Sequence, residues 1–265
     1  MLNQAGAPFR AAIRSVGDEK ILGLRVEDCV HFDFLDPRTY GPTFEGIRTV
    51  FLVRPPNLAN PKEEIEPAIL HAQSAGVRHI VFLSLLGAEK NPFVPHHKIE
   101  NLILASGIPY TFLRPSFFMQ NLSTIHANEI KRINEILVPA GSGKTSFIDI
   151  RDVAAVAVVA LTKESLKNKA LTLTGPAALS YLEVAAILTR ELGRPIAYKS
   201  PSILRFIRAM RKRRLNWPYI GVMSAIYAIN RVGLAAKVTP DVGRILGREP
   251  ICFKQFARDY RDVWL

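Results

Sequence analysis

The sequence predicts a protein of the α/β class, with a doubly wound parallel sheet and a smaller, mostly helical C-terminal lobe. Short β-branched or apolar runs alternate with longer stretches of helical period up to about residue 175, which is the pattern of βα units. Beyond Pro201 nearly every segment has helical period. The 265 residues, 48% of them hydrophobic, suffice for one large domain with a lobe. We expect the sheet domain over residues 1–175 and the lobe over residues 176–265.

Several runs in the first domain have the composition of strands. They cover residues 9–16, 29–34, 48–53, 79–84 and 110–113. Two stretches within them, Val50 to Val53 and Ile80 to Leu83, are continuously apolar, as strands buried on both faces of a parallel sheet are. The strands of such a sheet end at one edge, and ligands of open α/β sheets bind there.

Helix start and stop signals lie between these strands. Pro61 opens a helix with acidic residues in its first turn, and Gly76 closes it. A second helix runs from about Pro95 to Ser106, with Gly107 as its left-handed cap. In the lobe, residues 180–183 form a capping box that opens a helix ending at Gly193, and a short strand follows over residues 196–198.

A glycine-rich segment at residues 140–145 looks like the end of a phosphate-binding P-loop. Val138 stands where that motif requires Gly, so the spacing does not match. A P-loop also leads straight into a helix, whereas residues 146–150 have the pattern of a strand. We expect a glycine-rich hairpin turn followed by this strand, and then a helix over residues 154–161.

Charge, cysteine content and apolar run lengths indicate the cellular compartment and the kind of partner to expect. Residues 190–265 hold 16 Lys and Arg against 5 Asp and Glu, a net +11 out of +12 for the whole chain. The two cysteines are too few for a disulfide framework, which favours a reduced, cytoplasmic setting. The N-terminus has no secretory pattern, and the longest uncharged apolar run, Val153 to Leu161, is far shorter than the roughly 20 residues of a spanning helix.

The basic excess is concentrated in a helix expected over residues 203–215. Ile203, Phe206, Ile207 and Met210 form one apolar stripe, and cationic side chains cover the rest of the helix. Such a helix suits peripheral contact with an anionic membrane and equally suits the outer surface of the lobe. Nucleic acid is a less favoured partner, because no Trp or Tyr is interleaved with the cations for stacking and no known DNA-binding motif occurs.

Five segments, taken together, carry a resemblance to a known family. They are residues 33–37, 75–88, 106–115, 117–122 and 173–176, which read DFLDP, AGVRHIVFLSLLGA, SGIPYTFLRP, FFMQNL and LTGP. In this order and spacing they resemble the NmrA-like family of atypical short-chain dehydrogenase/reductases over essentially the whole chain. The resemblance implies a Rossmann domain that binds NAD or NADP and a smaller lobe that binds a small-molecule substrate.

The sequence departs from this family at its N-terminus. A domain of this kind begins with a strand and a glycine-rich turn whose amides bind the pyrophosphate at a helix N-terminus. No such glycine motif occurs in the sequence, and Met1 falls where the first helix would be ending. We expect about 20 residues of strand, turn and helix to be missing, judged from the size of half a βαβ unit.

The resemblance implies cofactor contacts at the carboxyl ends of the strands. Arg14 stands where the family places a cation for a 2′-phosphate or ribose, which favours NADP over NAD. Asp33 and Phe34 match positions beside the adenine. Ordinary structural alternatives are a surface arginine at a strand end and a turn cap at Asp33. Further candidates, for which loop geometry is the alternative, are Pro55, Ser84, Leu85 and Pro115.

The usual catalytic pair of a short-chain dehydrogenase is absent. That pair is a Tyr that passes a proton to the substrate oxygen and a Lys four residues later that lowers the phenol pKa. Aligned on Glu100, these positions are Pro92 and His96. His96 remains as a candidate proton donor, and Lys98 as a candidate contact for the nicotinamide ribose. The alternative is a solvated first helical turn. No spacing of Cys and His suits a metal, and none is expected.

The residues after the fifth expected strand are candidates for a substrate pocket. The resemblance places Phe117, Phe118, Met119 and Asn121 near the nicotinamide. Aromatic and Met residues at such spacing equally suit a buried helix start. We expect an NAD(P)H-dependent oxidoreductase for a small carbonyl or quinone-like compound. The alternatives are a regulator that binds NAD(P) without turnover and a truncated product with impaired cofactor binding.

Overall fold

The computed structural model describes residues 2, 6–15, 17–21 and 23–265 of the chain. The chain divides into two compact units, and each is discontinuous in sequence. The first unit comprises residues 1–114 and 154–171, and the second comprises residues 115–153 and 172–265. The assignment of a cofactor domain to residues 1–175 and of a substrate lobe to residues 176–265 stays a prediction.

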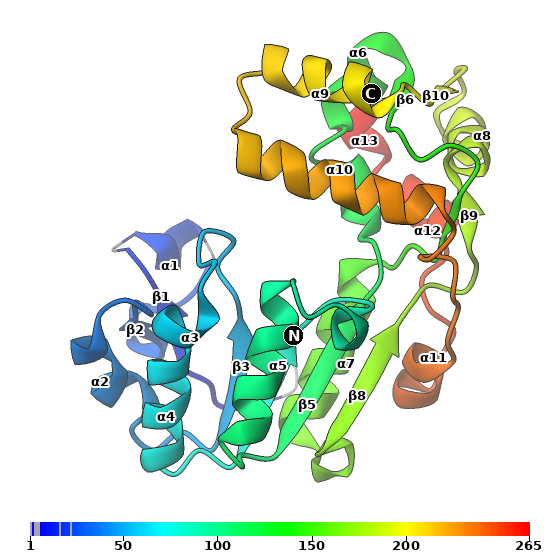
Figure 1. Ribbon diagram of the computed structural model, residues 1–265. Helices are drawn as coiled ribbons and strands as arrows, with labels where there is room; N and C mark the ends of the chain where they lie inside the picture. The colour runs from blue at the N-terminus through cyan, green and yellow to red at the C-terminus, as the bar shows by residue number, and fades with distance from the viewer. Residues whose placement is uncertain (1, 3–5, 16, 22) are drawn as a thin grey trace. The chain divides into compact units, whose positions relative to one another are not determined.

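A four-stranded sheet with the order β3-β4-β5-β8 forms the centre of the first unit (Figure 1). Its strands are β3 (Thr49–Val53), β4 (His79–Leu83), β5 (Tyr110–Pro115) and β8 (Lys169–Leu173). β3 pairs with β4, and β4 with β5, in parallel. A separate two-stranded parallel sheet pairs β1 (Ala11–Ile13) with β2 (Cys29–His31). The protein therefore has the α/β fold that the sequence predicts.

Helices cover the four-stranded sheet. Side chains of α2 (Tyr40–Phe44), α4 (Glu66–Ser74) and α5 (Pro95–Ala105) pack on one face against Ile80, Phe82 and Phe112. Val81 points to the opposite face, because side chains alternate along a strand, and α7 (Ile150–Thr162) lies on that side (Figure 1). The shorter helices are α1 (Asp18–Ile21), η2 (Val26–Asp28), η3 (Pro37–Thr39), α3 (Pro61–Glu64), η4 (Ala88–Lys90) and η6 (Glu164–Leu166).

All the expected strands of the first unit are confirmed, with altered bounds. β1 covers only residues 11–13 of the expected run, and Val16 lies outside the described residues. β2 ends early because Asp33 turns the chain, its carboxylate accepting a hydrogen bond from the Leu35 amide at 2.9 Å. The helix expected from Pro61 is interrupted at Ile65, because Pro67 has no N–H to donate to the preceding turn.

The second unit is mostly helical and also contains two small sheets. β6 (Glu135–Leu137) pairs in parallel with β10 (Ala197–Lys199), and β7 (Lys144–Thr145) pairs antiparallel with β9 (Leu179–Ser180). Its helices are η5 (Met119–Leu122), α6 (Ala127–Ile133), α8 (Tyr181–Leu192), α9 (Ile203–Lys212), α10 (Trp217–Arg231), α11 (Asp241–Leu246), α12 (Phe253–Asp259) and α13 (Arg261–Trp264).

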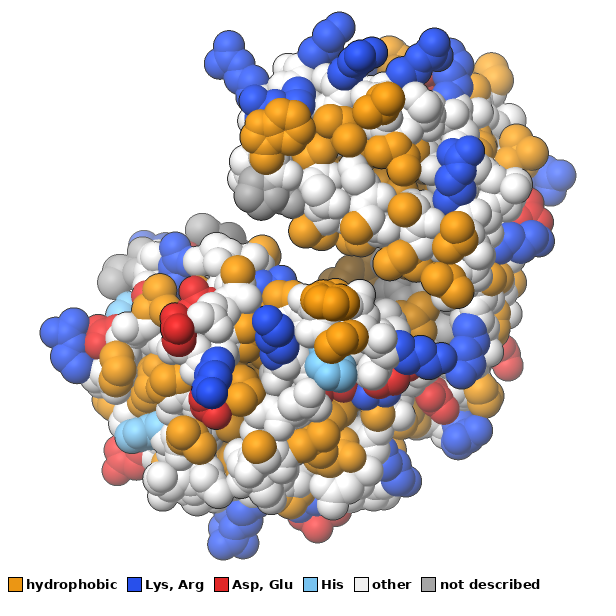
Figure 2. Space-filling model, in the orientation of Figure 1, with side chains coloured by type: hydrophobic (Ala, Val, Ile, Leu, Met, Phe, Trp, Pro, Cys, Tyr) orange, Lys and Arg blue, Asp and Glu red, His pale blue; other side chains and the backbone are white. Residues whose placement is uncertain are grey.

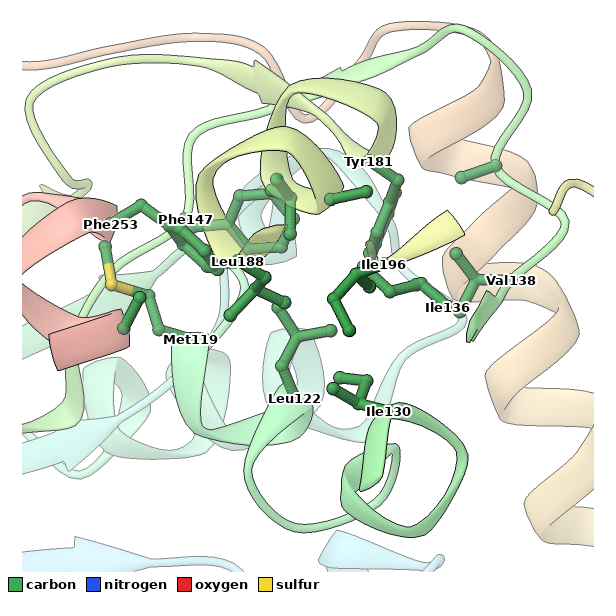
Figure 3. Close-up of a cluster of buried hydrophobic side chains, with 14 of the residues drawn as sticks. Met119, Leu122, Ile130, Ile136, Val138, Phe147, Tyr181, Leu188, Ile196 and Phe253 are labelled. Atoms are coloured by element: carbon green, nitrogen blue, oxygen red, sulfur yellow. The ribbon is translucent and has the colours of Figure 1, made fainter. Parts of the chain in front are cut away.

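The capping box that opens α8 is confirmed. Ser180 Oγ accepts a hydrogen bond from the Glu183 amide at 3.2 Å, and the Glu183 carboxylate accepts one from the Ser180 amide at 2.7 Å. Gly193 ends the helix at φ +69°, a left-handed conformation that favours glycine. α8 then packs Tyr181 and Leu188 into the core of the second unit (Figure 3).

The hairpin expected at residues 140–150 is wrong. β6 and β7, which flank the glycine-rich segment, pair with β10 and β9 and not with each other. Residues 146–149 form no strand, because their amides bond elsewhere: Ser146 N–H donates to Ala235 O and Ile148 N–H to Phe117 O. Gly143 is required by packing, since a Cβ there would lie 1.8 Å from the Asn230 carbonyl oxygen.

The basic helix is confirmed as α9. Phe206 and Met210 are buried on its apolar side, and Figure 2 shows Lys and Arg side chains gathered over this part of the second unit. Across the described part of the chain, no helix combines the length and apolar character needed to cross a bilayer.

Candidate functional site

A groove of about 1250 Å³ runs through the first unit between the two sheets. Its walls come from β1 and the residues around it, from the turn after β2, from β3 and the loop that follows, and from α4 and the end of α7. Four of the predicted cofactor residues line it, at the ends of three different strands: Arg14, Asp33, Phe34 and Pro55. The fold therefore brings together residues that lie up to 41 positions apart in the sequence.

The Arg14 side chain lines this groove and makes no hydrogen bond or ion pair with the described residues. It follows β1 directly and is exposed. Neighbouring Arg10, by contrast, is held by the fold, because its guanidinium donates to the carbonyl oxygens of Pro42 and Glu45, each at 2.9 Å. A free guanidinium at a strand end can bind a phosphate with two parallel hydrogen bonds.

Asp33 and Phe34 combine a structural role with a half-buried position at the groove. The Asp33 carboxylate caps its own turn, as the alternative interpretation holds, through the bond from the Leu35 amide. The Phe34 ring packs edge-on against Phe32, with ring centroids 4.7 Å apart. Both residues still line the groove, where an aromatic face and an acceptor oxygen are suited to a purine ring.

Pro55 lies in a loop that is held by Arg54. The Arg54 guanidinium donates to the carbonyl oxygens of Pro55, Pro56 and Leu58 at 2.7 to 3.1 Å. Burial lowers the pKa of Arg54 from its ordinary value. Arg54 is not among the residues predicted from the sequence, although a cation at the carboxyl end of a buried strand is a detectable signal.

Ser84 belongs to a buried charge network and not to the groove lining. Its hydroxyl donates to Glu100 Oε1 at 2.6 Å, and Arg114 binds both oxygens of the same carboxylate at 2.9 and 2.6 Å. Burial opposes the charge of Arg114, but its bonds to Glu100 and the carboxylate of Glu89 raise its pKa overall. The Ser84 hydroxyl is therefore already engaged within the fold.

His96 opens α5 and is uncharged at neutral pH. Its ring stacks on Phe82, with centroids 5.9 Å apart, and its buried Nδ1 has no hydrogen-bond partner among the described residues. Burial, together with the nearby charge of Arg54, lowers the pKa of His96 from 6.5 to about 4. Adjacent His97 faces another way and bonds the Ala88 carbonyl oxygen at 2.9 Å. A neutral imidazole can give or accept a hydrogen bond, but it carries no extra proton.

Leu85 and Lys98 are not among the residues that line the groove. Leu85 accepts a hydrogen bond from the Ala88 amide in the turn after β4. Lys98 is exposed on α5. Their roles toward a cofactor stay predictions.

The remaining predicted residues, Pro115 and the four substrate-pocket candidates, belong to the second unit. Met119 is 1% exposed and packs in the core with Phe147, the arrangement of a buried helix start. Phe117 packs partly buried against that core, and Phe118 forms an isolated bridge with Ile148. Asn121 is half-buried at the same helix. Their contact with substrate stays a prediction.

A buried carboxylate at the start of α7 is also not among the residues predicted from the sequence. Asp149 is fully buried, accepts a hydrogen bond from Gln120 Nε2 at 2.9 Å and pairs with Arg151 at 2.8 Å. Arg151 also bonds Asp259, and hydrogen bonds to the two carboxylates raise its pKa. The sequence predicted a strand over residues 146–150, which would place Asp149 within a sheet. The residue instead lies directly before a helix, so its pairing with Arg151 was not predicted.

Comparison with known proteins places the chain in a family. The sequence profile of the NmrA-like family matches residues 1–230. The chain belongs to the NmrA-like family. Among curated relatives of this NmrA-like protein, the NAD(P)H azoreductase of Xenophilus azovorans is 34% identical over 263 residues, which are 97% of this chain and 91% of the relative. The agroclavine dehydrogenase of Claviceps fusiformis is 31% identical over 278 residues, and the match covers 100% of this chain and 93% of the relative.

Solved structures show the same fold. The triphenylmethane reductase of Citrobacter sp., complexed with NADP(H), matches with a TM-score of 0.84 at 23% identity over 97% of this chain and 93% of that chain. The NADPH-dependent quinone oxidoreductase of Escherichia coli, complexed with NADPH, matches with a TM-score of 0.87 at 21% identity over 97% of this chain and 92% of that chain. At these identities the likeness establishes the fold of this NmrA-like chain.

Proposed function

We propose that this NmrA-like chain binds NAD(P)H in the groove of its first unit and reduces a small, fairly apolar carbonyl or quinone-like compound. The observation that carries the proposal is the grouping of Arg14, Asp33, Phe34 and Pro55 along one groove. The names of the relatives support it, since they include an NAD(P)H azoreductase and an agroclavine dehydrogenase.

The groove residues fit the adenosine half of the cofactor. Arg14 would bind a 2′-phosphate, which favours NADP over NAD. Phe34 would lie against the adenine, and the free carboxylate oxygen of Asp33 would accept a hydrogen bond. For the pyrophosphate, the described lining contains only one glycine, Gly46, and no glycine-rich turn. We therefore expect binding that depends strongly on the 2′-phosphate.

When bound, the cofactor supplies the hydride. His96, being uncharged, would orient the substrate oxygen as a hydrogen-bond donor at neutral pH and would not deliver a proton as an imidazolium. Lys98, Ser84, Leu85 and Pro115 are proposed at the nicotinamide end. Phe117, Phe118, Met119 and Asn121 are proposed to shape the substrate site. Quinone-like acceptors suit this site best, because their reduced oxygens are more acidic than those of an alcohol and need less help from a protein acid.

A titration followed by a turnover assay tests the proposal. Purified protein is titrated with NADPH and separately with NADH while protein fluorescence is recorded, and NADPH oxidation is then measured with a panel of quinones and azo dyes. We expect saturable NADPH binding and quinone-dependent oxidation. Absence of nucleotide binding would refute the proposal.

A regulator without turnover is the second candidate function. Pro92 and His96 at the positions of the catalytic pair favour it, because neither can replace a tyrosine, and so does the neutral state of His96. Saturable binding of NADPH, with no oxidation by any member of the quinone and azo-dye panel, would establish the regulator and exclude the enzyme.

We further propose that α9 contacts an anionic membrane surface in a cytoplasmic setting. Leu204 and Trp217 are 68% and 60% exposed beside the cations of the helix, and the Arg211 guanidinium lies 4.7 Å from the centroid of the Trp217 ring. Exposed Trp beside Arg is typical of segments that lie at a bilayer surface. Nucleic acid stays the less favoured partner.

A further inference from the structure

A second cavity, of about 490 Å³, lies within the second unit and follows α9. Five of its lining residues belong to one face of this helix, because they recur at intervals of four: Arg205, Ala209 and Arg213, and beside them Phe206 and Met210. At a rise of 1.5 Å per residue this face is about 12 Å long. The cavity is therefore elongated along the helix, which suits a chain-shaped ligand.

The other wall of the cavity comes from the carboxyl ends of two paired strands. Leu137 ends β6 and Lys199 ends β10, and the two residues lie opposite each other in this parallel pair. Ser200 and Pro201, which also line the cavity, lead from β10 into α9. In such a strand–turn–helix unit ligands bind at the carboxyl ends of the strands, and anions bind at the N-terminus of the helix.

The interior of the cavity is apolar. Phe206 and Met210 are each 1% exposed and form its floor, and Leu137 and Ala209 are half-buried beside them. The volume lies within the roughly 300 to 1000 Å³ of ordinary ligand pockets. A ligand that fills this space must therefore present an apolar surface to the protein.

The cations of the lining differ in whether a carboxylate neutralises them. Lys199 pairs with Glu135 at 2.5 Å. Arg213 pairs with the buried carboxylate of Glu129. The exposed side chain of Arg205, by contrast, makes no hydrogen bond or ion pair with the described residues. It stands in the first turn of α9, where the helix dipole favours a negative charge. The cavity therefore offers an anion one uncompensated guanidinium.

We propose that this cavity binds a single-chain amphipathic monocarboxylate, a molecule of the fatty acid class. The alkyl chain lies along Phe206, Ala209 and Met210, and the carboxylate receives two parallel hydrogen bonds from the Arg205 guanidinium. One uncompensated cation matches one negative charge, which favours a carboxylate over a phosphate monoester with its charge near −2. None of the residues proposed for the cofactor or the substrate lines this cavity, so the site goes beyond the oxidoreductase proposal.

Calorimetric titration with dodecanoate, below the concentration at which it forms micelles and without any nucleotide, tests the site. We expect saturable binding. Dodecanol supplies the same chain without the charge, and acetate supplies the carboxylate without the chain, so each should bind at least tenfold more weakly. Equal binding of dodecanol would overturn the role of the anion. Tighter binding of dodecyl phosphate than of dodecanoate would overturn the assignment of a monocarboxylate.

Three protein variants locate the binding. Arg205→Gln removes the uncompensated charge and should weaken dodecanoate binding at least tenfold. Arg208→Gln, also at an exposed position of α9 but outside the lining, is the matched control and should leave binding unchanged. Ala209→Leu adds volume inside the cavity and should weaken binding of dodecanoate and of dodecanol alike. Circular dichroism checks that the variants fold.

The results distinguish a built pocket from general attraction to the basic helix. Loss of binding in Arg205→Gln with retention in Arg208→Gln supports the proposal. Equal losses in both variants would show that the anion adsorbs to the basic surface of α9, and would overturn it. Uptake that does not saturate, or that Ala209→Leu leaves unchanged, overturns it as well. Because no nucleotide is present, failure of NADPH to bind leaves this test unaffected.

Discussion

Arg14 and Asp33 line the same groove but differ in how much of their binding capacity the fold already uses. The Asp33 carboxylate holds its own turn through the Leu35 amide. Arg14 is exposed and bonds none of the described residues. Substitution of Arg14 should therefore affect ligand binding with little effect on stability, as exposed positions without structural contacts usually do.

Arg14→Ala is expected to weaken NADPH binding by about tenfold or more, because a charge-assisted hydrogen bond contributes about 1.5 to 3 kcal/mol. NADH lacks the 2′-phosphate, so its affinity should change much less. Calorimetric titration of both nucleotides measures the difference. Arg25→Ala, an exposed arginine outside the groove, is the control. Equal losses for NADPH and NADH would contradict the assigned role of Arg14.

His126 is the buried histidine of the second unit. It is 2% exposed and bonds the Tyr227 hydroxyl at 2.5 Å. Burial, with a further contribution from the charge of Arg213, lowers its pKa from 6.5 to about 4. Between these values the unfolded chain binds more protons than the folded one, so stability falls as the pH falls.

The His126 contribution is expected to be fully present above pH 6.5 and to be lost as the pH falls toward 4, at a cost of about 3 kcal/mol. Urea unfolding across this range measures it. His126→Gln should flatten the pH dependence, whereas His31→Gln, at an exposed position on β2, should not. An unchanged slope in His126→Gln would show that this histidine is not the responsible group.

At the scale of elements, local sequence signals predict the ends of helices accurately, but they predict short strands less accurately. The capping box of α8 and the Gly193 stop are satisfied within a few residues of sequence, so tertiary contacts are not needed to locate them. A short apolar run such as residues 146–150 has no local signal of this kind. Its amides bond Ala235 and Phe117, which the sequence gives no reason to place beside it.

The amphipathic element α9 gives a prediction of its own. Arg205→Glu/Arg208→Glu should abolish co-sedimentation with vesicles of phosphatidylcholine and phosphatidylserine, because each cation near an anionic surface contributes about 1 kcal/mol. Lys131→Glu/Arg132→Glu, at exposed positions on α6, is the matched control. Binding of the unaltered protein should fall with added salt. Failure of that protein to sediment at low salt would refute the membrane contact.

At the scale of the whole molecule, each unit has its own core and its own buried charge network. Glu100 and Arg114 pair in the first unit, and Asp149 and Arg151 pair in the second. Removing one partner of a buried pair leaves an uncompensated charge, which typically costs about 3 to 5 kcal/mol. The two units therefore have separate determinants of stability, and a ligand that binds one unit need not stabilise the other directly.

NADPH should stabilise the first unit selectively. At a concentration one hundred times its Kd, a ligand that binds only the folded state adds about 2.7 kcal/mol. Hydrogen exchange should show this as protection of the amides around β1, the turn after β2 and the loop after β3. Buffer without nucleotide is the reference. Protection confined to the second unit would mean that the nucleotide binds elsewhere.

The candidate site was predictable only in part. Arg14, Asp33, Phe34 and Pro55 follow successive strands, and strand ends of a parallel sheet meet at one edge, so their grouping follows from the βα pattern. Ser84 occupies an equivalent position in sequence, yet its hydroxyl is bonded to Glu100. That pairing spans 16 residues and depends on how α5 packs, which no local pattern encodes.

The sequence by itself determined the α/β class, the family and the ends of α5 and α8, because alternation, motif order and caps are local properties of the chain. Only the tertiary structure decided the protonation of His96 and His126, the engagement of Ser84 and the open groove between β1 and β3. Burial, long-range pairing and cavities arise when distant segments pack together, and their energies depend on neighbours that the linear order does not specify.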